Sequence, residues 1–241
     1  MALPAWIKLP SGWITGGGLR SFRWSGGTGA DHTAALMALA AIAHRIDRET
    51  GVASATYDTL CMATSLSRAK LSDGLDILAE QQLIERTPNG RSTYRLTDYD
   101  PERGWTMLPA KSLCNKEGRI LAFSDFHLRT IAELNALKLY FLFAAFRDRE
   151  ENLAKISYDK IVDYTAMERH RITTAVSLLA AHGLVYVDRV PSTAHENGYA
   201  NAYRIKGLEA YNHAATRGRA REIPPALRSP GVPMDFDDLI G

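Results

Sequence analysis

Two long apolar stretches dominate the pattern of hydrophobic and polar positions along the chain. Residues 33–45 and 131–147 are apolar on most faces and contain neither Gly nor Pro, which predicts one central helix in each. Their most apolar parts, residues 34–43 and 137–146, are about half as long as a helix that crosses a bilayer. We therefore expect two buried helices and no membrane association.

The first central stretch is followed by a succession of shorter patterns. Thr56-Tyr57-Asp58 is predicted to supply the N-cap of a second helix over residues 58–63. Ser67 opens a third helix, whose apolar positions recur at three-to-four spacing. Strand-like runs come next, and the Asn89-Gly90 pair between them is typical of a tight hairpin turn. The pattern therefore predicts helix, helix, turn, helix and hairpin.

The same succession recurs when the sequence is slid against itself by about one hundred residues. No gap is needed between the central helix and the strand that follows the third helix. Each unit also opens on a similar pentapeptide, Trp6–Pro10 in one and Trp105–Pro109 in the other. Aligned identities include Ala35-Leu36 with Ala136-Leu137, Asp47-Arg48-Glu49 with Asp148-Arg149-Glu150, Tyr57-Asp58 with Tyr158-Asp159, and Leu78-Ala79 with Leu179-Ala180.

This internal repeat predicts a chain in three parts. Residues 1–100 and 101–212 are expected to be two copies of one domain. In the second copy, Ser157-Tyr158-Asp159 is predicted to supply the N-cap of the second helix, over residues 159–164, and Glu168 opens the third. Residues 213–241 are rich in Arg and Pro, a composition that suits a disordered linker with an acidic tip.

Residues 56–96, TYDTLCMATSLSRAKLSDGLDILAEQQLIERTPNGRSTYRL, resemble winged helix-turn-helix DNA-binding domains over their full length. Residues 157–190 match the same pattern. Two such units in one chain are similar to plasmid and mobile-element replication initiators, and also to some bacterial transcription regulators. The resemblance implies a mainly α fold with small β-wings (α+β), built as two tandem winged-helix domains. It also implies that each third helix enters the DNA major groove, while the hairpin wing touches backbone or minor groove.

The polar residues at the implied DNA-facing positions agree with that role. Arg and Lys can donate hydrogen bonds to guanine, whereas Ser, Thr and helix-start amides suit phosphates. An ordinary solvated helix face is the alternative interpretation, and the longer second wing is equally well explained as a loop. The candidates are Ser67, Arg68, Lys70 and Asp73 on one third helix, Arg169, His170, Arg171, Thr173 and Thr174 on the other, and Arg91, Ser92, His195 and Asn197 on the wings.

We expect the second copy to bind DNA more strongly than the first. The start of its third helix is more basic. The first copy also carries Gly74 where the second has Ala175, and an interior Gly costs a helix roughly 1 kcal/mol relative to Ala.

The segment before the first central helix offers two further motifs. Residues 19–24 mix cations with aromatics; a leading strand of the domain is the favoured interpretation, and a DNA-contacting arm is the alternative. Gly26-Gly27-Thr28-Gly29 lacks the Lys-Ser/Thr completion of a phosphate-binding loop, so we expect a flexible turn there.

Composition and motif content narrow the class of protein further. The net charge of +2 is too small to indicate a general affinity for nucleic acid. The prediction of DNA binding therefore depends on local basic patches. Cys61 and Cys114 match no metal or redox spacing. With no secretory signal in MALPAWIKLP, a reducing, cytoplasmic setting fits best. The His residues form no HExxH or Cys/His metal set and no GxSxG motif occurs, so we expect neither an enzyme nor a metal or cofactor.

The end of the chain, residues 233–241, resembles the acidic tip of bacterial single-stranded DNA-binding proteins. In that family the tip docks replication and repair proteins through acidic residues and a terminal Phe. This chain ends in Leu239-Ile240-Gly241 instead, and a generic acidic tail is the alternative interpretation. The resemblance implies a host replication protein as a partner, bound through Asp235, Phe236, Asp237, Asp238 and Leu239.

Together these features predict a protein that binds a specific double-stranded DNA site in replication initiation or maintenance of a plasmid or mobile genetic element. A transcriptional regulator of the same architecture is the first alternative. An interaction protein, whose winged helices dock other proteins and never touch DNA, is the second. The second central helix carries bulky aromatic residues at positions 140, 141, 143 and 146, which offer surface for packing the two units together or for a homo-oligomer.

Overall fold

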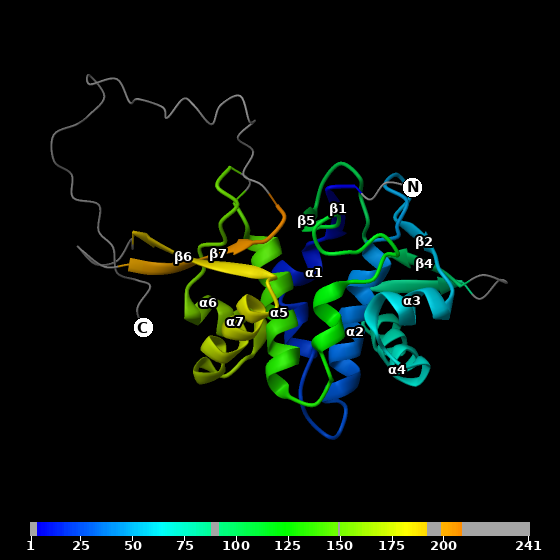
Figure 1. Cartoon of the computed structure of the whole chain (residues 1–241), viewed down its shortest axis with the longest axis horizontal. Helices are drawn as coiled ribbons and strands as arrows, with labels where there is room; N and C mark the ends of the chain where they lie inside the picture. The colour runs from blue at the N-terminus through cyan, green and yellow to red at the C-terminus, as the bar shows by residue number, and fades with distance from the viewer. Residues whose placement is uncertain (1–3, 88–91, 149, 192–198, 209–241) are drawn as a thin grey trace, which may run out of the picture.

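Two long helices packed side by side form the centre of the molecule, which has a mixed α+β fold (Figure 1). They are α2 (Gly29–Ala43) and α5 (Ile131–Phe146), and most residues of both are buried. Helices that are apolar on all faces belong in a protein core, so the prediction of two buried helices is confirmed. The computed structural model describes residues 4–87, 92–148, 150–191 and 199–208.

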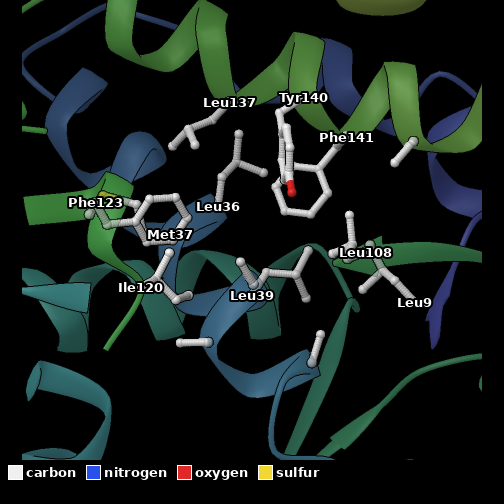
Figure 2. Close-up of a cluster of buried hydrophobic side chains, with 14 of the residues drawn as sticks. Leu9, Leu36, Met37, Leu39, Leu108, Ile120, Phe123, Leu137, Tyr140 and Phe141 are labelled. Atoms are coloured by element: carbon white, nitrogen blue, oxygen red, sulfur yellow. The ribbon is translucent and has the colours of Figure 1, made fainter. Parts of the chain in front are cut away.

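The core is continuous between the two central helices (Figure 2). Side chains from both helices meet there, together with side chains from two strands and from one neighbouring segment, and almost all are fully buried. Burial of apolar surface on this scale is the main favourable contribution to folding. The labelled members are Leu36, Met37 and Leu39 of α2, Leu137, Tyr140 and Phe141 of α5, and Leu9, Leu108, Ile120 and Phe123.

In the first half of the chain, up to residue 100, α3 (Tyr57–Thr64) and α4 (Arg68–Glu80) pack against α2. α4 begins directly after Ser67, as predicted, and α3 begins one residue before its predicted start. The hydroxyl groups of Thr56 and Ser67 each accept a hydrogen bond from the backbone N–H three residues later, at 3.1 and 3.3 Å, which satisfies donors at the helix start. This half also contains an antiparallel sheet in the order β2-β4-β3. Its strands are β2 (Val52–Ser54), β4 (Thr93–Leu96) and β3 (Ile84–Thr87).

In the second half, from residue 101, α6 (Tyr158–Thr165) and α7 (Ile172–Ala181) pack against α5. Ser157 caps α6 as predicted, through a 3.3 Å hydrogen bond from a backbone N–H. The third helical segment does begin after Glu168, but its first turn is the 3₁₀ helix η3 (Arg169–Arg171). The Glu168 side chain makes no capping hydrogen bond, which leaves that turn without a side-chain cap. The strands that follow are β6 (Val185–Pro191) and β7 (Tyr199–Ile205), an antiparallel pair.

The two halves are joined by a pair of strands that local periodicity did not reveal. They are β1 (Trp6–Pro10) and β5 (Trp105–Pro109), which run antiparallel. In each strand the Trp lies opposite the Pro of the other, so the two similar pentapeptides pair about their central residues, Lys8 and Met107. The first pentapeptide is therefore held by the second half of the chain.

The segment that precedes α2 also packs against the second half. It contains α1 (Gly12–Thr15) and η1 (Gly18–Ser21), and the Arg20 Nη1 atom donates a hydrogen bond to the Asp163 carbonyl oxygen at 3.0 Å. The prediction of a strand at residues 19–24 is therefore wrong. Two apolar side chains three residues apart in this segment are fully buried, and a 3₁₀ turn places such a pair on one side.

The equivalent segment before α5 packs in the opposite sense, against the first half. It contains η2 (Leu121–Asp125), and the Ile120 N–H donates to the Ala63 carbonyl oxygen at 2.9 Å. Each half is thus completed by a segment from the other.

Gly74 allows two helices of the first half to approach closely. A Cβ atom at this position would lie 2.8 Å from Ala35 N and 2.9 Å from the Ala34 carbonyl carbon, both in the backbone of α2. Gly74 is itself buried within α4. The structure corrects our interpretation of this residue as a weak point, because the propensity cost of Gly is offset by closer packing of α4 on α2.

Candidate nucleic-acid interface

The four candidate residues predicted for the third helix of the first half all lie at or near the start of α4. Ser67 is the N-cap, and Arg68 is the first helical residue. The Arg68 guanidinium forms an ion pair with Asp58 of α3, with 2.5 Å between Nη2 and Oδ1. The Lys70 ammonium forms ion pairs with Asp31 of α2 and, at 3.6 Å, with Asp73. Each cation at this helix start therefore already has a carboxylate partner.

Lys70 is held in its charged form by these partners. The hydrogen bond to Asp31 raises the pKa of Lys70, and the charge of the same carboxylate adds to the effect. Because Lys70 is only half-buried, the ammonium group stays at the surface of the α2–α4 contact.

The start of the third helical segment in the second half carries a similar set of ion pairs. Arg169 pairs with Asp159 of α6, and its guanidinium lies 5.5 Å from the ring centroid of Tyr158. The Glu168 carboxylate accepts from Arg171 Nε at 3.0 Å and lies 3.3 Å from His170 Nε2. The remaining two candidates, Thr173 and Thr174, are exposed on the first turn of α7.

One of these ion pairs has the same place in both halves. Arg68 with Asp58, and Arg169 with Asp159, each link the first residue of the third helical segment to the first turn of the second helix. All four side chains are well exposed, and exposed ion pairs contribute little stability. Either arginine can therefore leave its aspartate at small cost in stability.

The turn between the second and third helical segments is also built alike in both halves. Thr64 and Thr165, both fully buried, donate to a backbone carbonyl four residues earlier and accept a backbone N–H two residues later. Between them and the next segment, Ser65 and Ala166 adopt left-handed conformations, with φ of 61° and 52°. This turn sets the direction of the third segment and so aims the two arginines.

The wing candidates are only partly within the described residues. Ser92 is half-buried just before β4, whereas Arg91, His195 and Asn197 lie outside the described residues. The second hairpin is the longer one, since β6 and β7 have seven residues each where β3 and β4 have four. Its large exposed apolar side chains are Tyr186, Val187 and Tyr199.

Sequence reasoning missed a buried polar pair beside the second of these helix starts. Asn135 and Lys138 lie one turn apart on α5, and only 4% and 3% of their surfaces are exposed. Burial, and after it the charge of the nearby Arg23, lowers the pKa of Lys138 to about 8. Asn135 and Lys138, as polar residues inside a mostly apolar stretch, were the signal available in the sequence.

Several other expectations meet the structure only in part. The acidic tip, Asp235 to Leu239, lies outside the described residues. In the part of the chain that the structure describes, no three His, Cys, Asp or Glu side chains gather as a metal site requires. No helix among the described residues is long and apolar enough to cross a membrane. Comparison with models of known protein families and with curated proteins found no match.

Proposed function

We propose that this chain binds double-stranded DNA through the starts of α4 and of η3–α7, as two winged-helix units within one molecule. The observation that carries the proposal is the paired arrangement of arginine and aspartate at the start of both third segments. Because exposed ion pairs add little stability, a contribution to stability does not explain why both halves have this arrangement. Exposed arginines at a helix start do suit contacts with phosphates and guanines.

The order of elements supports the winged-helix interpretation. In each half a central helix is followed by two shorter helical segments and an antiparallel hairpin. In Figure 1, α4 and α7 lie on opposite sides of the central helix pair, both toward the lower edge, while β1 and β5 lie at the top. One face can therefore present both third segments to a duplex.

Local details at a constant offset support an internal repeat. Asp47 and Asp148 each accept hydrogen bonds from the backbone N–H groups two and three residues later. Gly51 and Asn152 follow them with positive φ, at 68° and 57°. The offset is 101 positions in both cases, the same as between Arg68 and Arg169.

Selection from a random duplex pool, followed by affinity measurements at several salt concentrations, tests the proposal. We expect a common sequence motif and an affinity that falls steeply with salt, because contacts to phosphates release condensed counterions. A pool that returns no motif, with retention that does not depend on salt, would favour a protein-docking role instead.

We further propose that the DNA site serves replication or maintenance of a plasmid or mobile element, on the basis of the family resemblance. Mapping the bound sites in cells separates this role from transcriptional regulation. Repeated sites at a replication origin support the first role, whereas a single operator within a promoter supports the second.

A further inference from the structure

A cavity of about 220 Å³ lies at the contact between the two halves, beside the start of η3. It is bounded by the segment 22–25 from the first half, by one face of α5, and by the turn 166–168 with Arg171. The binding face that we propose for DNA thus borders a hollow whose walls come from both halves.

Two buried hydrogen-bond donors line this cavity without enough acceptors. The Lys138 ammonium donates to the Phe22 carbonyl oxygen at 2.9 Å, and no carboxylate among the described residues pairs with it. The Asn135 Nδ2 atom has no hydrogen-bond partner within the described part of the chain. A buried cation and a buried amide donor are costly when they are left unpaired. An acceptor that carries negative charge would complete both.

The first half of the chain shows that the fold does not require these polar groups. At the offset of 101, Ala34 stands in the place of Asn135 and Met37 in the place of Lys138. Both are fully buried apolar residues of α2. The same two helix positions are therefore occupied by apolar side chains in the first half.

Arg171, the cation at the rim of the cavity, has a different ion-pair partner from Lys70, its counterpart in the first half. Lys70 of the first half pairs with Asp31, but the residue at the equivalent place beside Arg171 is Ala132. Arg171 pairs instead with Glu168 on its own turn, and about a third of its side chain is exposed. Relative to the first half, this site lacks the counterpart of Asp31 and has gained two donors, while Glu168 stands in the place of Ser67.

We propose that the cavity is an anion site that binds a phosphate group, held by the Lys138 ammonium and the Asn135 amide, with Arg171 at its entrance. Arg23, which is exposed, adds positive charge at the same opening. Glu168 is the one acid in the lining and is engaged by Arg171 and His170. The phosphate is either a free phosphate compound or a backbone phosphate of bound DNA; the same donors recognise both.

Titration of the intact protein with inorganic phosphate, at constant ionic strength and without DNA, tests the site itself. We expect saturable binding by calorimetry and a rise in the thermal midpoint. The double variant Asn135→Ala with Lys138→Met, which installs the residues of the first half, should lose about tenfold or more in affinity, as for a lost hydrogen bond to a charged group. Lys155→Met, which removes an exposed cation paired with Glu151, is the matched control and should bind as the wild type does.

A second variant keeps the test decisive if the double variant does not fold. Glu168→Gln removes the acid from the lining and frees Arg171, so phosphate should bind several-fold more tightly. The proposal is overturned if wild-type protein gives no saturable response, if the folded double variant responds as the wild type does, or if Glu168→Gln leaves the affinity unchanged or lower.

Measurements of duplex DNA binding distinguish a free phosphate compound from a backbone phosphate of DNA. Only this part of the test rests on the proposed function. If the site holds a backbone phosphate, the double variant should reduce the salt slope of DNA binding by about one. An unchanged slope together with lost phosphate binding assigns the site to a free phosphate compound. A chain that binds phosphate but no duplex would refute the proposed function and leave the anion site standing.

Discussion

Trp6 and Trp105 stack across the β1–β5 pair, with ring centroids 5.7 Å apart and ring planes inclined by 14°. A cation flanks each ring: Arg48 lies 5.2 Å from the Trp6 centroid and Lys8 lies 4.8 Å from the Trp105 centroid. The two halves therefore meet through an aromatic pair at one end and through α2 and α5 in the core.

We predict that Trp105→Ala lowers the free energy of unfolding of the whole chain by about 1–3 kcal/mol, because a half-buried ring and its stacking partner are lost. Urea denaturation followed by circular dichroism measures this change. Tyr186→Ala removes an aromatic ring that is 51% exposed, and should change stability by no more than about 0.5 kcal/mol. Equal losses in both variants would show that the Trp pair does not join the halves.

Gly74→Ala separates packing from helix propensity. Propensity alone predicts a gain of roughly 1 kcal/mol. The backbone of α2 stands 2.8 Å from the added Cβ atom, so we expect a net loss of about 1–3 kcal/mol, as for overpacked cores. Thermal and urea unfolding report the sign. Ala69→Gly, at an exposed position of the same helix, should cost only the propensity term, and a stabilised Gly74→Ala protein would contradict the packing argument.

DNA binding should depend more on the second half than on the first. Replacing Arg169 and Arg171 with Ala should weaken binding to the selected duplex by about 1–3 kcal/mol per base-contacting residue. Replacing Arg68 and Lys70 should weaken it less, because the second helix start carries more basic residues. Fluorescence anisotropy at one salt concentration compares the pairs, with Arg103→Ala near β5 as the control that removes an exposed cation elsewhere. A larger loss from the first pair would reverse the ranking.

Lys138 should make stability depend on alkaline pH. Its pKa is lowered from 10.5 to about 8, first by burial and then by Arg23. The unfolded chain therefore binds more protons than the native state between these two values, and the free energy of unfolding should rise with pH across that interval. The other titratable neighbour, His32, has a pKa lowered by burial and is already neutral there.

Lys138→Met should accordingly raise the free energy of unfolding near neutral pH by about 1–3 kcal/mol in phosphate-free buffer, after allowing for the lost hydrogen bond to Phe22. The gain should shrink as the pH approaches 10. Urea denaturation at pH 7 and pH 10 checks both statements. A variant that is less stable at pH 7 would show that the hydrogen bond to the Phe22 carbonyl outweighs the cost of burying the charge.

Removal of residues 234–241 tests the acidic tip, which is expected to dock a protein and not DNA. Asp235, Asp237 and Asp238 repel phosphates, so duplex affinity should stay unchanged or rise slightly after truncation. The same truncation should abolish pull-down of a host replication protein and impair function in cells. Full activity of the truncated protein in cells would reduce the tip to a solubilising end.

Local physics alone predicted the two central helices and the helices that follow each of them. Apolar periodicity marked α2 and α5, and the hydroxyl side chains of Thr56, Ser67 and Ser157 marked three helix starts, because capping and burial act over a few neighbouring residues. The same information located the candidate arginines at the helix starts. It did not show that each arginine pairs with an aspartate ten residues earlier, since that contact depends on the angle between two helices.

Tertiary structure decided everything that joins residues far apart in the chain. Pairing of β1 with β5 and the crossing of the segment before each central helix depend on which half lies where, and no local pattern carries that information. Gly74 acquired its role only when α4 met α2. In the same way, Lys138 and Asn135 became buried donors in the lining of a cavity only when residues 22–25 and the turn before η3 closed over them, because burial and charge are properties of the assembled surroundings.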